Sequence, residues 1–138
     1  MGIHNPNERL TKNFTRGELE CPHCHMLPSK TFIEFLQEFR SALGLRMNIS
    51  SGCRCKVYNN DILKGYKYST HMVVVDGEPF GTVDVKTGRY NNSFRWKIIT
   101  LAIEMGFNNI EVCNFHTHIG CVPPEHPGYN RIIWGTSK

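Results

Sequence analysis

Two histidines separated by one residue, His116 and His118, lie in a segment that the sequence predicts to be a β-strand. Side chains of a strand alternate between its two faces, so both imidazoles point to one side and Thr117 points to the other. Residues two apart on one face are about 6–7 Å apart, a spacing at which both rings can act on one metal ion and its bound water. We therefore expect a catalytic metal centre on this face, with His71 and Asp84 as further candidate ligands.

The metal expected for these residue types is zinc. A catalytic zinc ion usually takes three protein ligands and keeps a fourth position for water. Two imidazoles and one carboxylate leave a net charge of about +1 on such a centre, which lowers the pKa of the water and polarises a substrate carbonyl group. His71, Asp84 and the pair of histidines come from three separate segments, so a sheet must bring these segments side by side.

Four motifs resemble, in order, those of the zinc D-Ala-D-Ala carboxypeptidases and the related L-alanyl-D-glutamate endopeptidases. Residues 51–55, Ser-Gly-Cys-Arg-Cys, followed by Asn59, are similar to the Ser-Gly-Tyr-Arg…Asn signature of that family. The other three similarities are Ser-Thr-His at 69–71 to its Ser-x-His, Thr-Val-Asp-Val at 82–85 to its Ala-x-Asp-Ile, and His-Thr-His-Ile at 116–119 to its closing His-x-His segment. The motif order and its rough spacing extend over residues 13–134.

The resemblance assigns a role to each of these residues. The zinc ligands that it implies are His71, Asp84 and His118. It implies His116 as the catalytic histidine, Arg54 as the group that binds substrate or stabilises the oxyanion, and Ser69 as a contact to the substrate peptide. The chemistry agrees, because a guanidinium offers several N–H donors to an oxyanion or a carboxylate. An imidazole beside a ligand can move the proton of the attacking water or of the leaving amine.

The sequence departs from the family pattern in the spacing of the ligands. Twelve residues lie between His71 and Asp84, more than in the family, and they include Asp76 and Glu78, either of which could replace Asp84. We favour Asp84 because valines flank it as in a strand, whereas Asp76 lies in a turn. Phe115 stands where many relatives have a glutamate, so an active enzyme requires the His-x-His arrangement.

The six cysteines form three close pairs: Cys21 and Cys24, Cys53 and Cys55, and Cys113 and Cys121. A Cys-x-x-Cys pair is typical of a zinc knuckle, and Cys53 and Cys55 would complete a structural zinc site, with His23 or His25 as substitutes. Disulfides and unlinked thiols are equal alternatives, because spacing does not determine connectivity. Cys53 also replaces the tyrosine of the family signature. We expect Cys113 and Cys121 in the core, opposite the two histidines.

The remaining pattern predicts the elements that position these residues. Helices are expected over 29–44, with Ser29 as the N-cap, and over 93–105, closed by Gly106, because apolar residues recur there at helical spacing. Strands are expected over 47–51, 68–75, 80–86, 109–115, 116–121 and 131–134, with 68–75 and 80–86 joined as a hairpin, and short helical turns over 13–19 and 56–63. This order predicts an α+β domain with a mostly antiparallel sheet and flanking helices, as in the Hedgehog and DD-peptidase folds that the resemblance implies.

Length and composition are those of an ordinary globular chain. We expect one zinc peptidase-like domain over residues 1–138, of which 1–28 form an N-terminal arm with the cysteine-rich loop. The net charge is +4, and without a cluster of lysines and arginines we expect no nucleic-acid partner. The longest apolar run, 72–75, is too short to span a bilayer. Residues 1–20 show no signal peptide, so we expect a protein that is cytoplasmic until release, or one that is virion-associated.

The function expected from these features is hydrolysis of a peptide bond in the stem peptides of bacterial peptidoglycan, as a zinc-dependent carboxypeptidase or endopeptidase. A phage lysin, a virion-associated enzyme and a cytoplasmic bacterial enzyme all suit this expectation. The alternative is a zinc-binding structural or binding module without turnover, such as a phage tail component. The Hedgehog signalling domain, which has a similar motif order, is an example of partner binding on this fold. Expected partners are the peptidoglycan peptide and, for a phage protein, other virion proteins.

Overall fold

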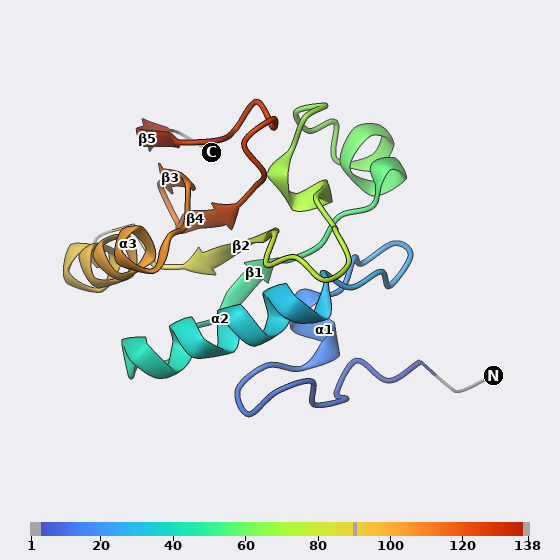
Figure 1. The fold of residues 1–138 in the computed structure, drawn as a ribbon, viewed down its shortest axis with the longest axis horizontal. Coiled ribbons are helices and arrows are strands. Elements are labelled where there is room, and N and C mark those ends of the chain that lie inside the picture. The colour runs from blue at the N-terminus through green and yellow to red at the C-terminus, as the bar shows by residue number, and fades with distance from the viewer. Residues whose placement is uncertain (1–3, 90, 137–138) are drawn as a thin grey trace.

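A five-stranded sheet is the centre of the computed structural model, which describes residues 4–89 and 91–136 (Figure 1). The strand order is β1-β2-β4-β3-β5. The strands are β1 (Ile49–Ser51), β2 (Gly81–Lys86), β3 (Asn109–Cys113), β4 (His116–Cys121) and β5 (Arg131–Thr136). All neighbours are antiparallel except β3 and β5, which are parallel. The predicted α+β class with a mostly antiparallel sheet is therefore confirmed.

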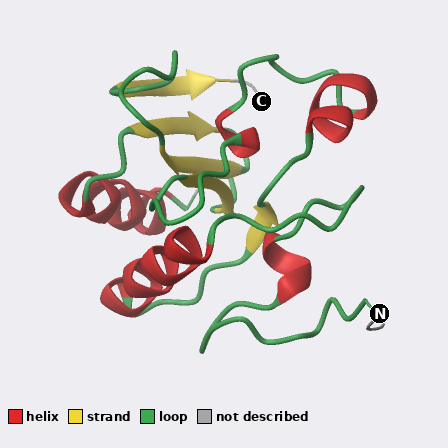
Figure 2. Cartoon of the chain, turned by 45° about the vertical axis from the view of Figure 1, so that its right-hand side comes forward, coloured by secondary structure: helices red, strands yellow, loops and turns green. Residues whose placement is uncertain are grey.

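Two helices of 14 residues each, α2 (Lys30–Leu43) and α3 (Asn92–Met105), lie on one side of the sheet (Figures 1 and 2). Ser29 is the N-cap of α2, because its hydroxyl oxygen accepts a backbone N–H of the first turn. Gly44 and Gly106 end the two helices with φ angles of 67° and 96°, in the left-handed region that favours glycine. Both predicted helices are confirmed, with the capping residues in the expected places.

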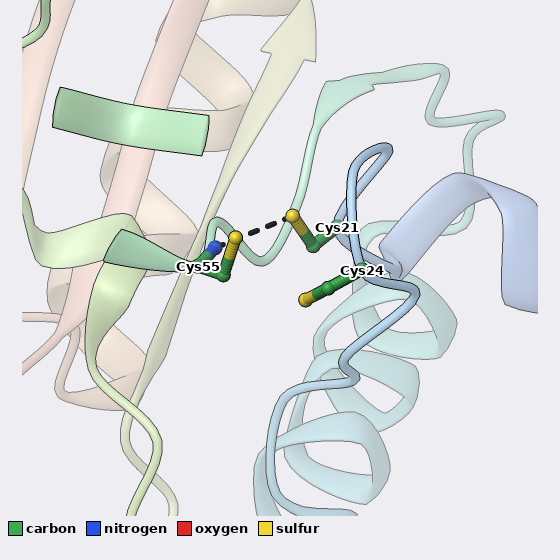
Figure 3. Close-up of side chains that lie close together, drawn as sticks. All are labelled: Cys21, Cys24 and Cys55. Atoms are coloured by element: carbon green, nitrogen blue, oxygen red, sulfur yellow. Dashed lines mark hydrogen bonds between the residues drawn. The ribbon is translucent and has the colours of Figure 1, made fainter. Parts of the chain in front are cut away.

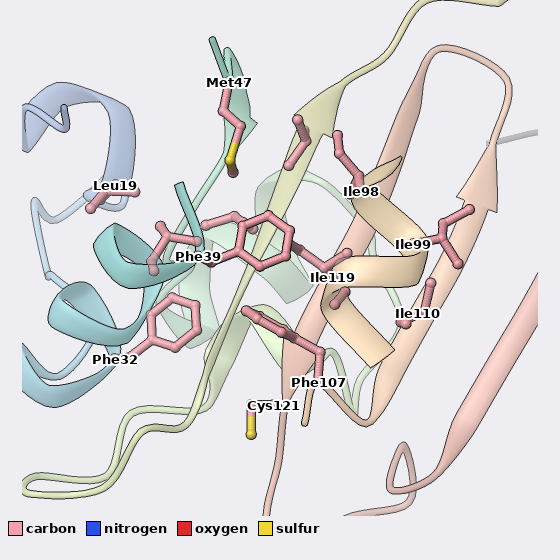
Figure 4. Close-up of a cluster of buried hydrophobic side chains, with 14 of the residues drawn as sticks. Leu19, Phe32, Phe39, Met47, Ile98, Ile99, Phe107, Ile110, Ile119 and Cys121 are labelled. Atoms are coloured by element: carbon pink, nitrogen blue, oxygen red, sulfur yellow. The ribbon is translucent and has the colours of Figure 1, made fainter. Parts of the chain in front are cut away.

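The apolar core lies between these helices and the sheet. Val83 and Val85 of β2 and Ile119 of β4 are fully buried there. They belong to one cluster with side chains of the two helices, among them Phe39 and Ile98 (Figure 4). Full burial of side chains of this size contributes roughly 1.5–3 kcal/mol each, so this face holds the strands in register.

The opposite face of the sheet is polar along its middle strands. Asp84 of β2 and Glu111 of β3 are both register partners of His118 on β4, so the three side chains share one face. His116 precedes His118 by two residues and lies on the same face. Thr117, between them, is fully buried. The predicted alternation of this strand is therefore confirmed.

The chain between β1 and β2 forms irregular helical turns outside the sheet (Figure 2). It contains a π-helix, η1 (Tyr58–Ile62), and a 3₁₀-helix, η2 (Thr70–Met72), which contacts β2 and β4. The strand predicted over 68–75, and its hairpin with β2, are wrong. Both edges of β2 already pair with β1 and β4, so no edge remains for the intervening segment.

The N-terminal part packs against the end of the core. A short helix, α1 (Arg16–Leu19), follows the fully buried Phe14 and ends at the fully buried Leu19. This confirms the predicted turn that attaches 13–19 to the body. Among the described residues, no helix has the length and apolar character needed to cross a membrane.

Candidate metal centre

Three side chains from separate segments lie together on the polar face: His71 from η2, Asp84 from β2 and His118 from β4. All three are buried, and their ligand atoms lie within 4.8 Å of one another. Asp84 Oδ1 is 3.2 Å from His71 Nε2 and 3.1 Å from His118 Nδ1. Nitrogen and oxygen ligands of a tetrahedral zinc ion are about 3.3–3.4 Å apart. The observed separations therefore suit one cation of this size.

The tautomer of His71 is fixed by a backbone carbonyl. Its Nδ1 donates to the carbonyl of Gly52 over 2.7 Å, which leaves Nε2 directed at Asp84. The backbone of His71 is held as well, because its carbonyl accepts the Arg54 N–H and its N–H donates to the hydroxyl of Ser69. A second partner of this kind orients metal-binding histidines in known sites.

The tautomer of His118 is fixed by a side-chain amide. Asn109 Nδ2 donates to the carbonyl of Gly128 over 2.8 Å, so the amide oxygen of Asn109 faces His118 Nε2 at 2.6 Å and accepts its proton. The hydroxyl of Thr70 lies 3.0 Å from the same nitrogen. His118 Nδ1 is therefore the nitrogen whose lone pair faces Asp84.

Once a cation takes the place of any proton shared with Asp84, two imidazole lone pairs and one carboxylate oxygen can converge on it. Burial lowers the pKa of His118, against the influence of Asp84. Burial opposes ionisation of Asp84, but the two neighbouring histidines outweigh it and hold the pKa of that carboxyl well below its usual range. Neutral imidazole and ionised carboxylate are the forms that bind a metal, so this buried set fits a divalent cation.

The second oxygen of Asp84 faces two other residues that the sequence analysis selected. Arg54 Nη2 is 3.6 Å and His116 Nε2 is 3.7 Å from Asp84 Oδ2. Arg54 Nε also donates to Ser51 Oγ over 3.1 Å, and its Nη1 donates to Asn59 Oδ1 over 3.4 Å. The arginine, serine and asparagine of the first motif therefore form one hydrogen-bonded unit beside the three converging side chains.

A cleft of about 570 Å³ opens over this centre. His71, His116 and His118 line it, so the imidazoles are reachable from solvent. Ser69 lines it too, as predicted for a substrate contact, while its hydroxyl also accepts the His71 N–H. Arg54 lines the cleft as well, whereas the buried Asp84 does not.

The three acidic residues lie in different places. Asp76 and Glu78 are exposed in the loop between η2 and β2. Asp84 alone among the three is grouped with His71 and His118. The insertion between the second and third motifs therefore forms a loop, and the carboxylate of β2 is the one beside the two histidines.

Asn109 and Cys113 are two of the cleft residues that the sequence did not predict. Asn109 has no motif around it, and its role depends on how β3 pairs with β4, which no local signal reveals. Cys113 is buried as predicted, but it lines the cleft with Glu111, on the side of the two histidines and not opposite them. The chain turns at 114–115 between two strands, so the alternation does not continue from Cys113 to His116. Cys121 is buried in the core as predicted.

The cysteine-rich loop forms a second group of ligand atoms. The sulfurs of Cys21, Cys24 and Cys55 lie within 4.8 Å of one another (Figure 3). Cys53, the fourth residue considered, is not part of this group; burial raises the pKa of its thiol to about 12. No disulfide joins these four described cysteines. The structure thus brings together three of the four.

The histidines of the same loop have different partners. His23 Nδ1 lies 3.6 Å from Cys55 Sγ. His25 Nδ1 lies 3.4 Å from Glu20 Oε1, and His4 Nε2 lies 2.7 Å from the same oxygen. The rings of His4 and His25 stack with centroids 3.7 Å apart. Of the two substitutes considered for a thiolate ligand, His23 is therefore the one beside the cysteines.

Comparison of the chain with protein-family models, with curated proteins and with solved structures finds no match. The class of protein defined by the fold and site is thus an α+β domain with three groups of side chains that could bind a metal among the described residues: His71, Asp84 and His118; Cys21, Cys24 and Cys55; and His4, Glu20 and His25.

Proposed function

We propose that the protein is a zinc-dependent peptidase that hydrolyses a peptide bond in the stem peptides of bacterial peptidoglycan. The observation that carries this proposal is the convergence of His71 Nε2 and His118 Nδ1 on Asp84 Oδ1, beside a cleft that both histidines line. Two imidazoles and a carboxylate are the donor set of catalytic zinc sites, whereas closed structural sites favour thiolates. Three protein ligands leave one position for water or substrate.

Each neighbouring residue has a defined part in hydrolysis. A zinc ion bound here supplies a Lewis acid, which lowers the pKa of water and polarises a carbonyl group. Arg54, held by Ser51 and Asn59, directs its guanidinium to the cleft, where it binds a substrate carboxylate or the oxyanion. His116, whose side chain is 25% exposed at the cleft, takes the proton of the attacking water and gives it to the leaving amine.

The lining of the cleft supports an anionic peptide substrate. Three cationic residues, Arg54, Lys64 and Arg131, line it against the single carboxylate of Glu111. Stem peptides carry free carboxylates, and a cationic lining attracts such ligands. The motif resemblance points to the same substrate class.

The test is hydrolysis of purified peptidoglycan and of a D-Ala-D-Ala peptide, with and without a chelator. Cleavage is expected to stop on chelation, to return with added zinc, and to be lost in His118→Ala. His4→Ala is the matched control, because it removes an imidazole that bonds to Glu20 and does not line the cleft. Undiminished cleavage by His118→Ala contradicts the proposal. Zinc binding without hydrolysis of either substrate favours the non-catalytic module instead.

A further inference from the structure

The three sulfurs of Cys21, Cys24 and Cys55 are arranged for one shared partner (Figure 3). Sulfur ligands about 2.3 Å from a tetrahedral zinc ion are about 3.8 Å apart. The observed sulfurs lie within 4.8 Å of one another, so a small contraction brings all three onto one ion. A disulfide would use two of these sulfurs and leave the third without a role.

Backbone N–H groups are directed at the same sulfurs. The N–H of Cys55 donates to Cys21 Sγ over 3.3 Å, and the N–H of Tyr58 donates to Cys55 Sγ over 3.4 Å. Such bonds favour the thiolate, the form that binds metals. The loop is closed by the His25 N–H on the Cys21 carbonyl and by the Cys21 N–H on the Met26 carbonyl. The thiol-bearing loop is therefore already in a compact conformation.

An imidazole is available as the fourth ligand. His23 Nδ1 lies 3.6 Å from Cys55 Sγ, about the separation of two ligands on one zinc ion. His25 is occupied by Glu20. Cys53 is buried outside the group of three sulfurs. His23, which contacts one of the three sulfurs, is thus the histidine of this loop placed to complete the set by a small movement of its ring.

The segment that carries Cys55 also carries Arg54. Three consecutive N–H groups bind three different parts of the chain: Cys53 donates to the Leu19 carbonyl, Arg54 to the His71 carbonyl, and Cys55 to Cys21 Sγ. A metal ion bound by Cys21 and Cys55 would stabilise the last of these three contacts, between Cys55 and the N-terminal loop. It would thereby restrain the backbone of Arg54, the preceding residue.

We propose that Cys21, Cys24 and Cys55, with His23, bind a structural zinc ion that is separate from the His71–Asp84–His118 centre. Three thiolates and one imidazole form a closed set typical of structural zinc. The ion joins the N-terminal loop to the segment that positions Arg54. The metal assignment is independent of the proposed function, whereas its consequence for Arg54 rests on that function.

Zinc content per chain, measured on full-length protein purified without chelator, tests the site. The wild type is expected to hold about two ions, and Cys24→Ser and Cys55→Ser about one. Cys121→Ser, a cysteine of the core, is the matched control and keeps both ions. Asp84→Ala separates the two proposals: a single ion that Cys55→Ser removes and Asp84→Ala retains supports this site and contradicts the catalytic one. Zinc retained in full by Cys55→Ser, or a disulfide within the cluster of freshly purified protein, overturns it.

Cobalt provides a measurement on the wild type that does not depend on the folding of a variant. Co²⁺ bound by thiolates gives a sulfur-to-metal charge-transfer band in the near ultraviolet, which a site of imidazoles and a carboxylate does not give. The band is expected on titration of the metal-free protein, and its absence overturns the site. His23→Ala is expected to weaken Co²⁺ binding at least about tenfold; unchanged affinity overturns the assignment of His23 as a ligand.

Discussion

At the scale of single residues, the proposed chemistry depends on the different partners of the two carboxylate oxygens of Asp84. Oδ1 faces the free ring nitrogens of His71 and His118, while Oδ2 faces Arg54 and His116. The same carboxylate therefore sets the ligand geometry and the place of the two groups that act on substrate. A displacement of this side chain would disturb both functions together.

Asn109→Ala tests the partner that orients His118. Loss of the amide oxygen removes the acceptor that fixes the His118 tautomer, and we expect metal affinity at the His/Asp centre to fall about tenfold to a hundredfold. The measurement is competition with a metal-binding dye on protein whose cysteine site is already saturated. Asn108→Ala is the control, because the side chain of Asn108 bonds only to the backbone of Val122 and to Cys121 among its described partners. Equal affinities in the two variants would contradict the role of Asn109.

Arg54→Lys tests the guanidinium as a catalytic residue. A lysine keeps the positive charge but cannot reach Ser51, Asn59 and the cleft at once. We expect kcat/KM for a D-Ala-D-Ala peptide to fall roughly 100- to 1,000-fold, with zinc content unchanged. Arg46→Lys, on a different surface of the molecule, should leave the rate unaltered. A rate for Arg54→Lys within about twofold of the wild type would remove Arg54 from the mechanism.

The buried thiol of Cys121 gives a pH dependence of stability that is independent of either metal group. Burial raises the pKa of this thiol, so above about pH 8.5 the unfolded chain loses a proton that the folded chain keeps. The free energy of unfolding therefore falls as pH rises, with a slope from this group of up to about 1.4 kcal/mol per pH unit. Urea denaturation of the wild type and of Cys121→Ala between pH 7.5 and pH 10 should show a flatter profile for the variant. Parallel profiles would show that Cys121 does not contribute.

At the scale of elements, the sequence predicted the parts whose signals are local. The ends of α2 and α3 followed from Ser29, Gly44 and Gly106, which act within one turn of the helix. Residues 68–75 were wrongly predicted as a strand, because their β-branched composition suits a strand but the sheet offers them no free edge. Strand formation depends on partner strands that are remote in sequence, and the composition of a segment does not identify those partners.

The candidate site likewise contains residues that local motifs predict and residues that only the pairing of strands brings into place. His71, Asp84 and His118 were predicted because the motifs contain them. Asn109 was not, because its contact with His118 depends on the pairing of β3 with β4. The face of Cys113 was mispredicted for a related reason, since a turn between strands interrupts the alternation. A motif therefore reveals the ligands more readily than the groups that orient them.

The glycine of the first motif has a packing role that predicts the effect of Gly52→Ala. A Cβ at this position would lie 2.6 Å from the carbonyl oxygen of Leu19 and 2.8 Å from its Cα, and backbone atoms cannot move aside cheaply. Because the Gly52 carbonyl accepts from His71 Nδ1, a displaced backbone disturbs the His71 ring as well. We expect a loss of about 1–3 kcal/mol in the free energy of unfolding, together with weaker zinc binding.

Urea denaturation and metal titration of the same Gly52→Ala preparation provide the check. Gly44→Ala is the control, because its added Cβ meets no atom within 4 Å and only the positive φ of 67° is strained. It should cost about 1 kcal/mol and leave zinc affinity unchanged. Zinc affinity that is equal in the two variants would refute the link between Gly52 and His71.

At the scale of the whole molecule, the two sides of the sheet are held by different forces. The side of α2 and α3 contains the apolar cluster. The segment between β1 and β2 instead has several exposed apolar side chains, including Val57, Ile62, Leu63 and Val74. Its attachment consists largely of polar contacts such as those of His71, Arg54 and Cys55. Because this segment leaves several apolar side chains exposed, metal ions at both groups would stabilise its attachment to the rest of the molecule.

Asp84→Asn tests this view, because its cost in stability should grow with metal. In the metal-free wild type, His71 and His118 stabilise the ionised carboxylate of Asp84, whereas an asparagine amide can replace only part of these contacts. With chelator, we therefore expect Asp84→Asn to fall below the wild type in the free energy of unfolding by about 1–3 kcal/mol. With zinc at about 1,000 times its dissociation constant, the wild type should gain about 4 kcal/mol that the variant lacks.

Thermal unfolding of both proteins, with zinc and with chelator, measures how much the difference in stability grows with metal. Chelation should lower the Tm of the wild type by roughly 10–20 °C and lower that of Asp84→Asn less, since the variant loses only the ion of the cysteine group. Asp76→Asn, an exposed aspartate in the loop before β2, should follow the wild type under both conditions. If Asp84→Asn is less stable than the wild type by the same margin with and without zinc, Asp84 stabilises the fold through its protein contacts alone. The convergence of His71, Asp84 and His118 would then be a buried ion-pair network, and the segment between β1 and β2 would not need a cation at this centre.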